Sequence, residues 1–160
     1  MTHEMGPTID VPLESLPSID EHGVLVLAPR AVVWDALVVT LRGFSSRGRE
    51  RGAELLGCAE TMTLGDPDRI GSTMPGFVVT RVVNPAVIAL AGQHRFSRYG
   101  LIFSLEETED EQTLLRAETR AAFPGIAGRV YRALVIGTRG HVLAVNRILR
   151  AVRRRAERNA

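Results

Sequence analysis

The sequence predicts a single α+β domain in which an antiparallel sheet is covered by one long C-terminal helix. Residues 71–123 alternate apolar and polar side chains with the period of two that half-buried strands show. Residues 126–158 contain no proline and repeat apolar side chains with a helical period. The chain has 160 residues, 45% of them hydrophobic, so one core can form without disulfides or metals. A sheet with one apolar face needs a cover, and only the C-terminal helix is long enough.

The N-terminal part is expected to contain an arm, a short strand and a helix. Residues 1–20 hold three prolines and show no period, so we expect a loosely ordered arm before a domain at residues 21–158. Val24–Leu27 is a short β-type run. Pro29 stands near the first position of the next helix, where its missing N–H costs nothing, and Gly43 ends that helix.

The middle of the chain is expected to consist mostly of strands. Arg42–Gly52 is rich in Gly, Ser and Arg and predicts a loop, and Gly65–Asp68 has the residues of a turn. Strands are predicted over Ala53–Met62, Phe77–Val83, Ala86–Gly92, Gln93–Glu106 and Thr113–Phe123.

Alternation assigns a face of the sheet to each residue of the last two predicted strands. Tyr99, Leu101 and Phe103 share the inward face. Glu118 and Arg120 fall on the outward face, where we expect a surface ion pair with Arg116 or Arg98 and no catalytic role.

The C-terminal helix is expected over Ile126–Arg158 and would be ~45 Å long if unbroken. Gly137 and Gly140 are its weak points, where it would bend. Its apolar side chains fall in one sector, and its arginines gather on the opposite flank. Ile136 and Leu143 lie on that flank, so exposed apolar side chains there would mark a homodimer contact.

Three segments resemble a known superfamily. Val24–Leu37, VLVLAPRAVVWDAL, resembles the opening of START-like, polyketide cyclase-like (SRPBCC) domains, where a strand runs into a proline-started helix with a Val-Trp-x-x-Leu pattern. Gly65–Val83, followed by the Asn84-Pro85 turn, resembles the middle strands of that superfamily. Arg95–Phe103, Leu115–Arg129 and the long helix after them resemble an uncharacterised bacterial branch.

The resemblance covers residues 22–155 and implies a helix-grip fold, in which a curved antiparallel sheet of about seven strands wraps around the long C-terminal helix. It also implies a cavity between sheet and helix, which in many relatives holds a lipid, sterol, polyketide or other apolar ligand. Some relatives are cyclases, dehydratases or hydrolases, whereas many only bind and carry. The superfamily has no common catalytic triad, so the resemblance implies a cavity and no particular mechanism.

Residues expected to face this cavity are the candidate ligand contacts. They are Trp34, Phe77, Val79, Tyr99, Leu101, Phe103, Thr119, Phe123, Tyr131, Val135, Thr138 and Val142. For Trp34 core packing is the favoured interpretation, whereas for the two tyrosines packing and ligand orientation are equally supported. His94 and His141 are the polar candidates, because a histidine near neutral pKa is a natural proton carrier.

Three function classes therefore stay open. The first is non-catalytic binding of a hydrophobic or amphipathic small molecule. The second is a cyclase- or dehydratase-type enzyme with His94 or His141 as base and the hydroxyl of Tyr99 or Tyr131 as acid. The third is an interaction module that binds an anionic partner through the arginine-rich helix face.

The sequence excludes several other kinds of site. All 20 basic residues are arginine, so a lysine-containing phosphate loop cannot exist. The four histidines and the single Cys58 have no metal-ligand spacing, and we expect no metal and no cofactor. The chain shows neither a secretory signal nor a transmembrane segment, which predicts a soluble cytoplasmic protein.

The net charge of +2 combines two opposite parts of the chain. Residues 1–115 carry nine arginines and sixteen acidic residues, for −7, and residues 116–160 carry eleven arginines and two glutamates, for +9. No aromatic residue interleaves the C-terminal arginines, so nucleic acid is not the expected partner. A solvated helix face, favoured by the helix dipole, is the competing interpretation.

Overall fold

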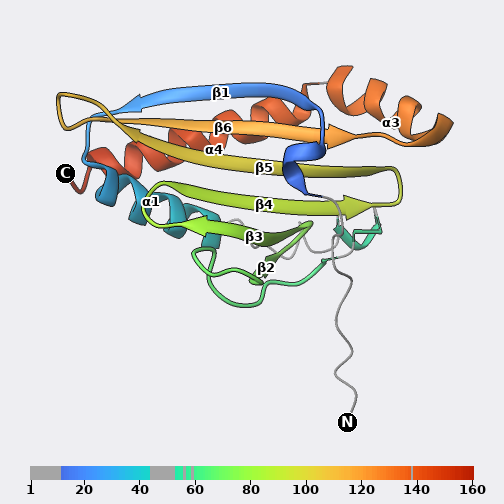
Figure 1. Cartoon of the computed structure of the whole chain (residues 1–160), viewed down its shortest axis with the longest axis horizontal. Coiled ribbons are helices and arrows are strands. Elements are labelled where there is room, and N and C mark those ends of the chain that lie inside the picture. The colour runs from blue at the N-terminus through green and yellow to red at the C-terminus, as the bar shows by residue number, and fades with distance from the viewer. Residues whose placement is uncertain (1–11, 44–52, 56, 59, 138) are drawn as a thin grey trace, which may run out of the picture.

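The computed structural model describes residues 12–43, 53–55, 57–58, 60–137 and 139–160, the side chains of 134–137 excepted. In this part of the chain, six strands form one antiparallel sheet in the order β1-β6-β5-β4-β3-β2 (Figure 1). The strands are β1 (Ser18–Val26), β2 (Thr73–Met74), β3 (Phe77–Val83), β4 (Val87–His94), β5 (Ser97–Glu107) and β6 (Thr113–Ala122). The helices are the 3-10 turn η1 (Leu13–Ser15), α1 (Arg30–Arg42), α3 (Gly125–Gly137) and α4 (Gly140–Glu157).

The sheet has six strands where about seven were expected, and two of the predicted strands are wrong. No strand forms in the described residues of Ala53–Met62, where Ala53–Leu55 make a helical turn. The prediction for Gln93–Glu106 joined two strands, because β4 runs on to His94 and the chain turns at Arg95 and Phe96 before β5 begins. That turn contains neither Gly nor Pro, so the sequence carried no turn signal there.

Residues 12–20 pack against the sheet, and the prediction of a loosely ordered arm is wrong for them. β1 begins at Ser18 and pairs with β6. Before it, Leu13 is only 6% exposed and lies on the outer face of the sheet. Gly100 makes room for this side chain, because a Cβ there would overlap the Leu13 Cδ2 atom. Residues 1–11 lie outside the described residues, and the domain boundary at residue 21 stays a prediction.

The outer face of β6 carries surface ion pairs, as predicted, but Glu118 and Arg120 pair with each other and not with Arg116 or Arg98. Arg120 Nη2 lies 2.9 Å from Glu118 Oε1, and Arg116 contacts Glu21 at 3.1 Å. Arg120 also donates to the Glu14 carbonyl at 3.0 Å, which ties η1 to the sheet. Such partly exposed pairs stabilise a fold by about 1 kcal/mol or less.

The core lies between the inner face of the sheet and the helices α1 and α4. Pro29 precedes α1 and accepts the Val33 N–H at 3.1 Å, and Gly43 caps its C-terminus, as predicted. The helix residues of this core include Val33, Trp34, Leu37, Leu41, Val145, Ile148, Leu149 and Val152. Since each such side chain contributes about 1.5–3 kcal/mol on burial, the packing of α1 and α4 on the sheet dominates the stability of the fold.

The predicted C-terminal helix is broken into two. α3 ends at Gly137 and α4 begins at Gly140, so the prediction of one continuous helix is wrong, although the break falls at its two weak points. Arg139 has φ = 53°, a left-handed conformation that no α-helix can contain. Figure 1 shows α4 running along the sheet beside α1, and α3 lying past it at the end where β4 turns into β5.

α3 approaches the sheet closely at one glycine. A Cβ on Gly128 would lie 2.8 Å from the carbonyl carbon of Phe123 and 3.1 Å from the Phe96 carbonyl oxygen. Only glycine therefore allows this contact.

Among the described residues, none of the helices combines the length and the hydrophobicity needed to cross a bilayer.

Candidate functional site

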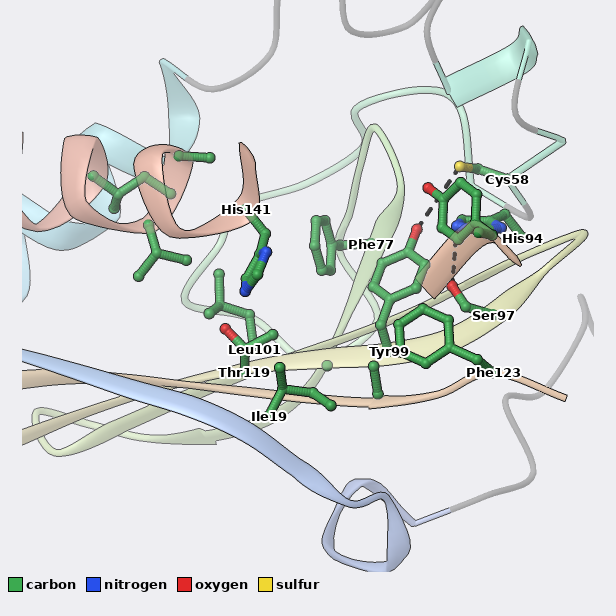
Figure 2. Close-up of a pocket in the computed structure, with 16 residues that line it drawn as sticks. Ile19, Cys58, Phe77, His94, Ser97, Tyr99, Leu101, Thr119, Phe123 and His141 are labelled. Atoms are coloured by element: carbon green, nitrogen blue, oxygen red, sulfur yellow. Dashed lines mark hydrogen bonds between the residues drawn. The ribbon is translucent and has the colours of Figure 1, made fainter. Parts of the chain in front are cut away.

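A pocket of about 270 Å³, partly open to solvent, lies between the inner face of the sheet and the helices α3 and α4 (Figure 2). Its apolar lining comes from Ile19, Phe77, Gly100, Leu101, Ala121, Phe123, Ala144, Val145 and Ile148. Its polar lining comes from Cys58, His94, Ser97, Tyr99, Thr119, Tyr131 and His141. The volume is near the lower end of the range for small-molecule sites.

The structure brings part of the predicted contact set together. Phe77, Tyr99, Leu101, Thr119, Phe123 and Tyr131 line the pocket, as do His94 and His141. Trp34, Val79 and Phe103 do not, because α1 and α4 bury them in the core. Val142 is half-buried but is not part of the lining. The side chains of Val135 and Thr138 lie outside the described residues.

Aromatic side chains close one end of the pocket and hold α3 there. The Tyr131 ring of α3 lies 4.7 Å from the His94 ring and stacks on Phe96 at 5.6 Å, between centroids. On the sheet, the Phe77 and Tyr99 rings meet edge to face at 5.2 Å. Such ring pairs add about 0.5–1.5 kcal/mol each beyond their burial. The cluster thus fixes α3 over the β4–β5 turn.

Tyr99 is fixed at this end of the pocket through its hydroxyl group. It donates to the Gly76 carbonyl at 2.8 Å and lies 3.7 Å from Cys58 Sγ. Gly92 leaves room for the Tyr99 ring and its hydrogen bond to Gly76, because a Cβ on Gly92 would overlap both the ring and the Gly76 carbonyl oxygen. Burial, and then the neighbouring Cys58, raise the pKa of Tyr99 well above its usual value. Tyr99 therefore stays a neutral hydroxyl and is a poor acid.

The geometry of His94 is unsuited to the base role considered from the sequence. Its Nδ1 accepts the Phe96 N–H at 3.1 Å, so Nε2 carries the proton and donates to Ser97 Oγ at 3.0 Å. Burial lowers the pKa of His94, which keeps the ring neutral. Both ring nitrogens of His94 are therefore engaged in hydrogen bonds. The Ser97 oxygen accepts from His94, so the Ser97 hydroxyl hydrogen is free to be donated to another group. The polar group available to a ligand at this end is thus the Ser97 hydroxyl, which His94 orients and which can donate a hydrogen bond.

A second polar group lies at the opposite end of the pocket, where β1 meets α4. His141 Nε2 lies 2.7 Å from Asp20 Oδ2, and His22 Nε2 lies 3.5 Å from the same oxygen. Asp20 Oδ1, His141 Nδ1 and Thr119 Oγ1 are buried and have no hydrogen-bond partner among the described residues. Figure 2 shows His141 and Thr119 at this end, with Phe77 between them and the aromatic end.

The pairing of β1 with β6 explains how Asp20 reaches this site, and a bulge just before it brings Ile19 to the pocket. The register with β6 shifts between Ser18 and Asp20, so that Asp20 stands opposite Thr119 and Ile19 is the extra residue. Asp20 therefore shares the inward face with Thr119, and Ile19 also lines the pocket. Sequence reasoning missed both residues because it placed them in the arm. The one available signal was that Asp20 continues the alternation of His22 and Val24 backwards.

Ser97 and Cys58 were missed for different reasons. Ser97 was placed inside a continuous strand, so its position beside His94 across a turn was hidden. Cys58 falls within the strand predicted over Ala53–Met62, whereas it is half-buried outside any strand. No group of three or more His, Cys, Asp or Glu side chains in the described part of the chain is arranged to hold a metal ion.

Comparison with solved structures identifies the fold. A conserved protein from Geobacillus kaustophilus superposes with a TM-score of 0.55 at 15% identity, over 86% of this chain and 94% of its own. The Zhui aromatase/cyclase from Streptomyces sp. R1128 gives 0.53 at 19% identity, over 89% and 94%. The Aha1 dimer from Colwellia psychrerythraea gives 0.51 at 16% identity, over 86% and 94%.

These similarities show the fold alone, since the identities are low. The chain has the α+β helix-grip fold of the START-like, polyketide cyclase-like proteins, as the sequence resemblance implied. No family model matches the sequence, and no curated protein matches it.

Acidification is expected to destabilise the protein through His94. Because burial lowers the pKa of folded His94 below the unfolded value of about 6.5, the unfolded state binds more protons in this range. The free energy of unfolding therefore falls as the pH drops below about 6.5, by at most about 1.4 kcal/mol per pH unit from this site. Denaturant unfolding of the wild type and His94→Gln at a series of pH values measures the difference.

The expected result is a steeper fall for the wild type than for His94→Gln. An NMR titration of the His94 ring checks the same point directly. Equal slopes, or a His94 pKa at or above about 6.5, would contradict the assignment of a neutral, half-buried ring.

Proposed function

We propose that the protein binds an apolar small molecule with a polar group at one or both ends, in the pocket between the sheet and helices α3 and α4. The observation that carries this proposal is the pocket itself, which is apolar along its middle and polar at two separated ends. A binding site of this kind takes its affinity from apolar burial and its orientation from a few placed polar groups.

The polar ends limit the chemistry of the ligand. At the aromatic end, the Ser97 hydroxyl can donate to a carbonyl or ether oxygen, because its own oxygen already accepts from His94. At the other end, the Thr119 hydroxyl and the imidazole of His141, which Asp20 orients, line the pocket and suit a ligand hydroxyl or N–H. These features support a ligand of the lipid- or polyketide-like class that carries a donor at one end and an acceptor at the other.

Filling the pocket is expected to abolish the binding of a neutral apolar probe. Ala144 is exposed at the pocket and lies on α4, so Ala144→Phe adds a ring there without replacing a core residue. N-phenyl-1-naphthylamine fluorescence should show binding to the wild type and an affinity reduced tenfold or more in the variant, about 1.4 kcal/mol. Circular dichroism checks that the variant is folded.

Leu143→Phe is the matched control. It places a ring at the preceding position of the same helix, where the Leu143 side chain is 70% exposed and does not line the pocket. Its affinity for the probe should stay within twofold of the wild type. No probe binding to the wild type, or equal losses in both variants, would overturn the proposed site.

Proton-transfer catalysis is a second candidate function, and the contact between Asp20 and His141 favours it. The carboxylate holds the proton on Nε2, so the lone pair of Nδ1 is unoccupied. An imidazole oriented by a carboxylate is a common arrangement for a general base. Of the two bases that the cyclase or dehydratase interpretation left open, this geometry favours His141 over His94.

Kemp elimination of 5-nitrobenzisoxazole tests for such a base without knowledge of the natural substrate. A base removes the ring C–H proton, its electron pair completes the nitrile, and the N–O bond breaks to release a coloured phenolate. With His141 as base, His141→Gln should lower kcat/KM tenfold or more, and Asp20→Asn should lower kcat and shift its pH profile. Rates equal to those of free imidazole, or unchanged in both variants, would exclude this candidate.

The homodimer and the cytoplasmic location expected from the sequence remain predictions. For the homodimer, Leu143 is 70% exposed, which is compatible with a contact, but the side chain of Ile136 lies outside the described residues.

A further inference from the structure

A second hollow lies on the other side of α4, between α4 and the C-terminal half of α1. Its volume is about 310 Å³. Four arginines of α4 line it, Arg147, Arg154, Arg155 and Arg158, together with Val39, Thr40 and Gly43 of α1 and its C-cap. Of its lining residues only Ile148 also lines the pocket, so the two sites lie on opposite flanks of one helix. We call this hollow the arginine groove.

The charges of the arginine groove are not neutralised by acidic side chains. None of its four guanidinium groups forms an ion pair within the residues that the structure describes. Glu157, the only acidic residue of α4, accepts from Arg153 Nε at 2.9 Å and from the Leu27 N–H at 3.1 Å instead. By contrast, Arg116 and Arg120 on the sheet each contact a carboxylate.

The helix dipoles do not balance these charges either. α1 and α4 both direct a C-terminus toward this region, and each C-terminus acts as about half a negative charge. Together they offset about one of the four positive charges. Holding like charges together in a concave site is unfavourable, and a bound anion would relieve that repulsion.

We infer that the arginine groove binds a small polyanion with two or more linked phosphate groups. A guanidinium fork matches two phosphate oxygens at once, and four forks in one hollow suit several phosphates better than a single one. No aromatic ring lines the groove, so it has no surface on which a nucleobase would stack. Val39 is its one exposed large apolar side chain, at 37%, which is too little for membrane insertion.

Calorimetric titration with inorganic tripolyphosphate at low salt tests the groove. The wild-type protein should bind it more tightly than it binds inorganic monophosphate, and binding should weaken as salt is raised. The double variant Arg154→Gln/Arg158→Gln should raise the tripolyphosphate Kd tenfold or more, because it removes two of the four forks. Circular dichroism and N-phenyl-1-naphthylamine binding should be unchanged, since neither residue lines the pocket.

Arg129→Gln/Arg132→Gln is the charge-matched control. These two arginines are exposed on α3 and do not line the groove, so the Kd should change less than twofold. Equal losses in both double variants would mean that net charge alone attracts the anion, and would overturn the proposal. So would the absence of tripolyphosphate binding, or groove-dependent binding of duplex DNA or anionic lipid vesicles in its place.

Discussion

The packing of α4 against α1 and the inner face of the sheet is the interaction on which the rest of this structure depends. Val145, Leu149 and Val152 of α4 are fully or almost fully buried there, together with Val33 and Leu37 of α1. α4 begins only at Gly140, after the break that follows Gly137, so its cover of the sheet stops there. The inner face beyond that point is left to α3, which docks through Tyr131 and does not fill the space. The pocket is the space that remains.

α4 therefore separates two sites of opposite chemistry. Its first two turns present His141, Ala144 and Val145 to an apolar pocket, and its later turns present arginines to the groove beside α1. The split of charge between the two parts of the chain has its origin here. The acidic part supplies most of the sheet, and the basic part supplies the last strand and both C-terminal helices. Charge and apolar ligand site thus belong to different flanks of one helix.

The fold was predictable from the sequence because its signals are periodic. Alternation placed Leu101, Thr119 and Phe123 on the inward face, and these residues line the pocket. The positions of the individual polar residues at the two ends of the pocket were harder to predict from the sequence. The β-bulge that brings Ile19 to the pocket beside Asp20 and the turn that separates His94 from Ser97 depend on strand register, which the pattern of one strand does not encode. Both polar ends of the pocket were consequently identified only in part.

An apolar ligand held between the sheet and helices α3 and α4 would contact the side chains that line this space. The most direct measurement is a set of intermolecular NOEs between bound N-phenyl-1-naphthylamine and the methyl groups of the protein. We expect NOEs to Ile19, Leu101 and Val145, which line the pocket, and none to Val26 or Val79, which lie in the core. NOEs confined to exposed methyl groups such as those of Leu143, or none to Leu101 and Val145, would contradict binding in this pocket.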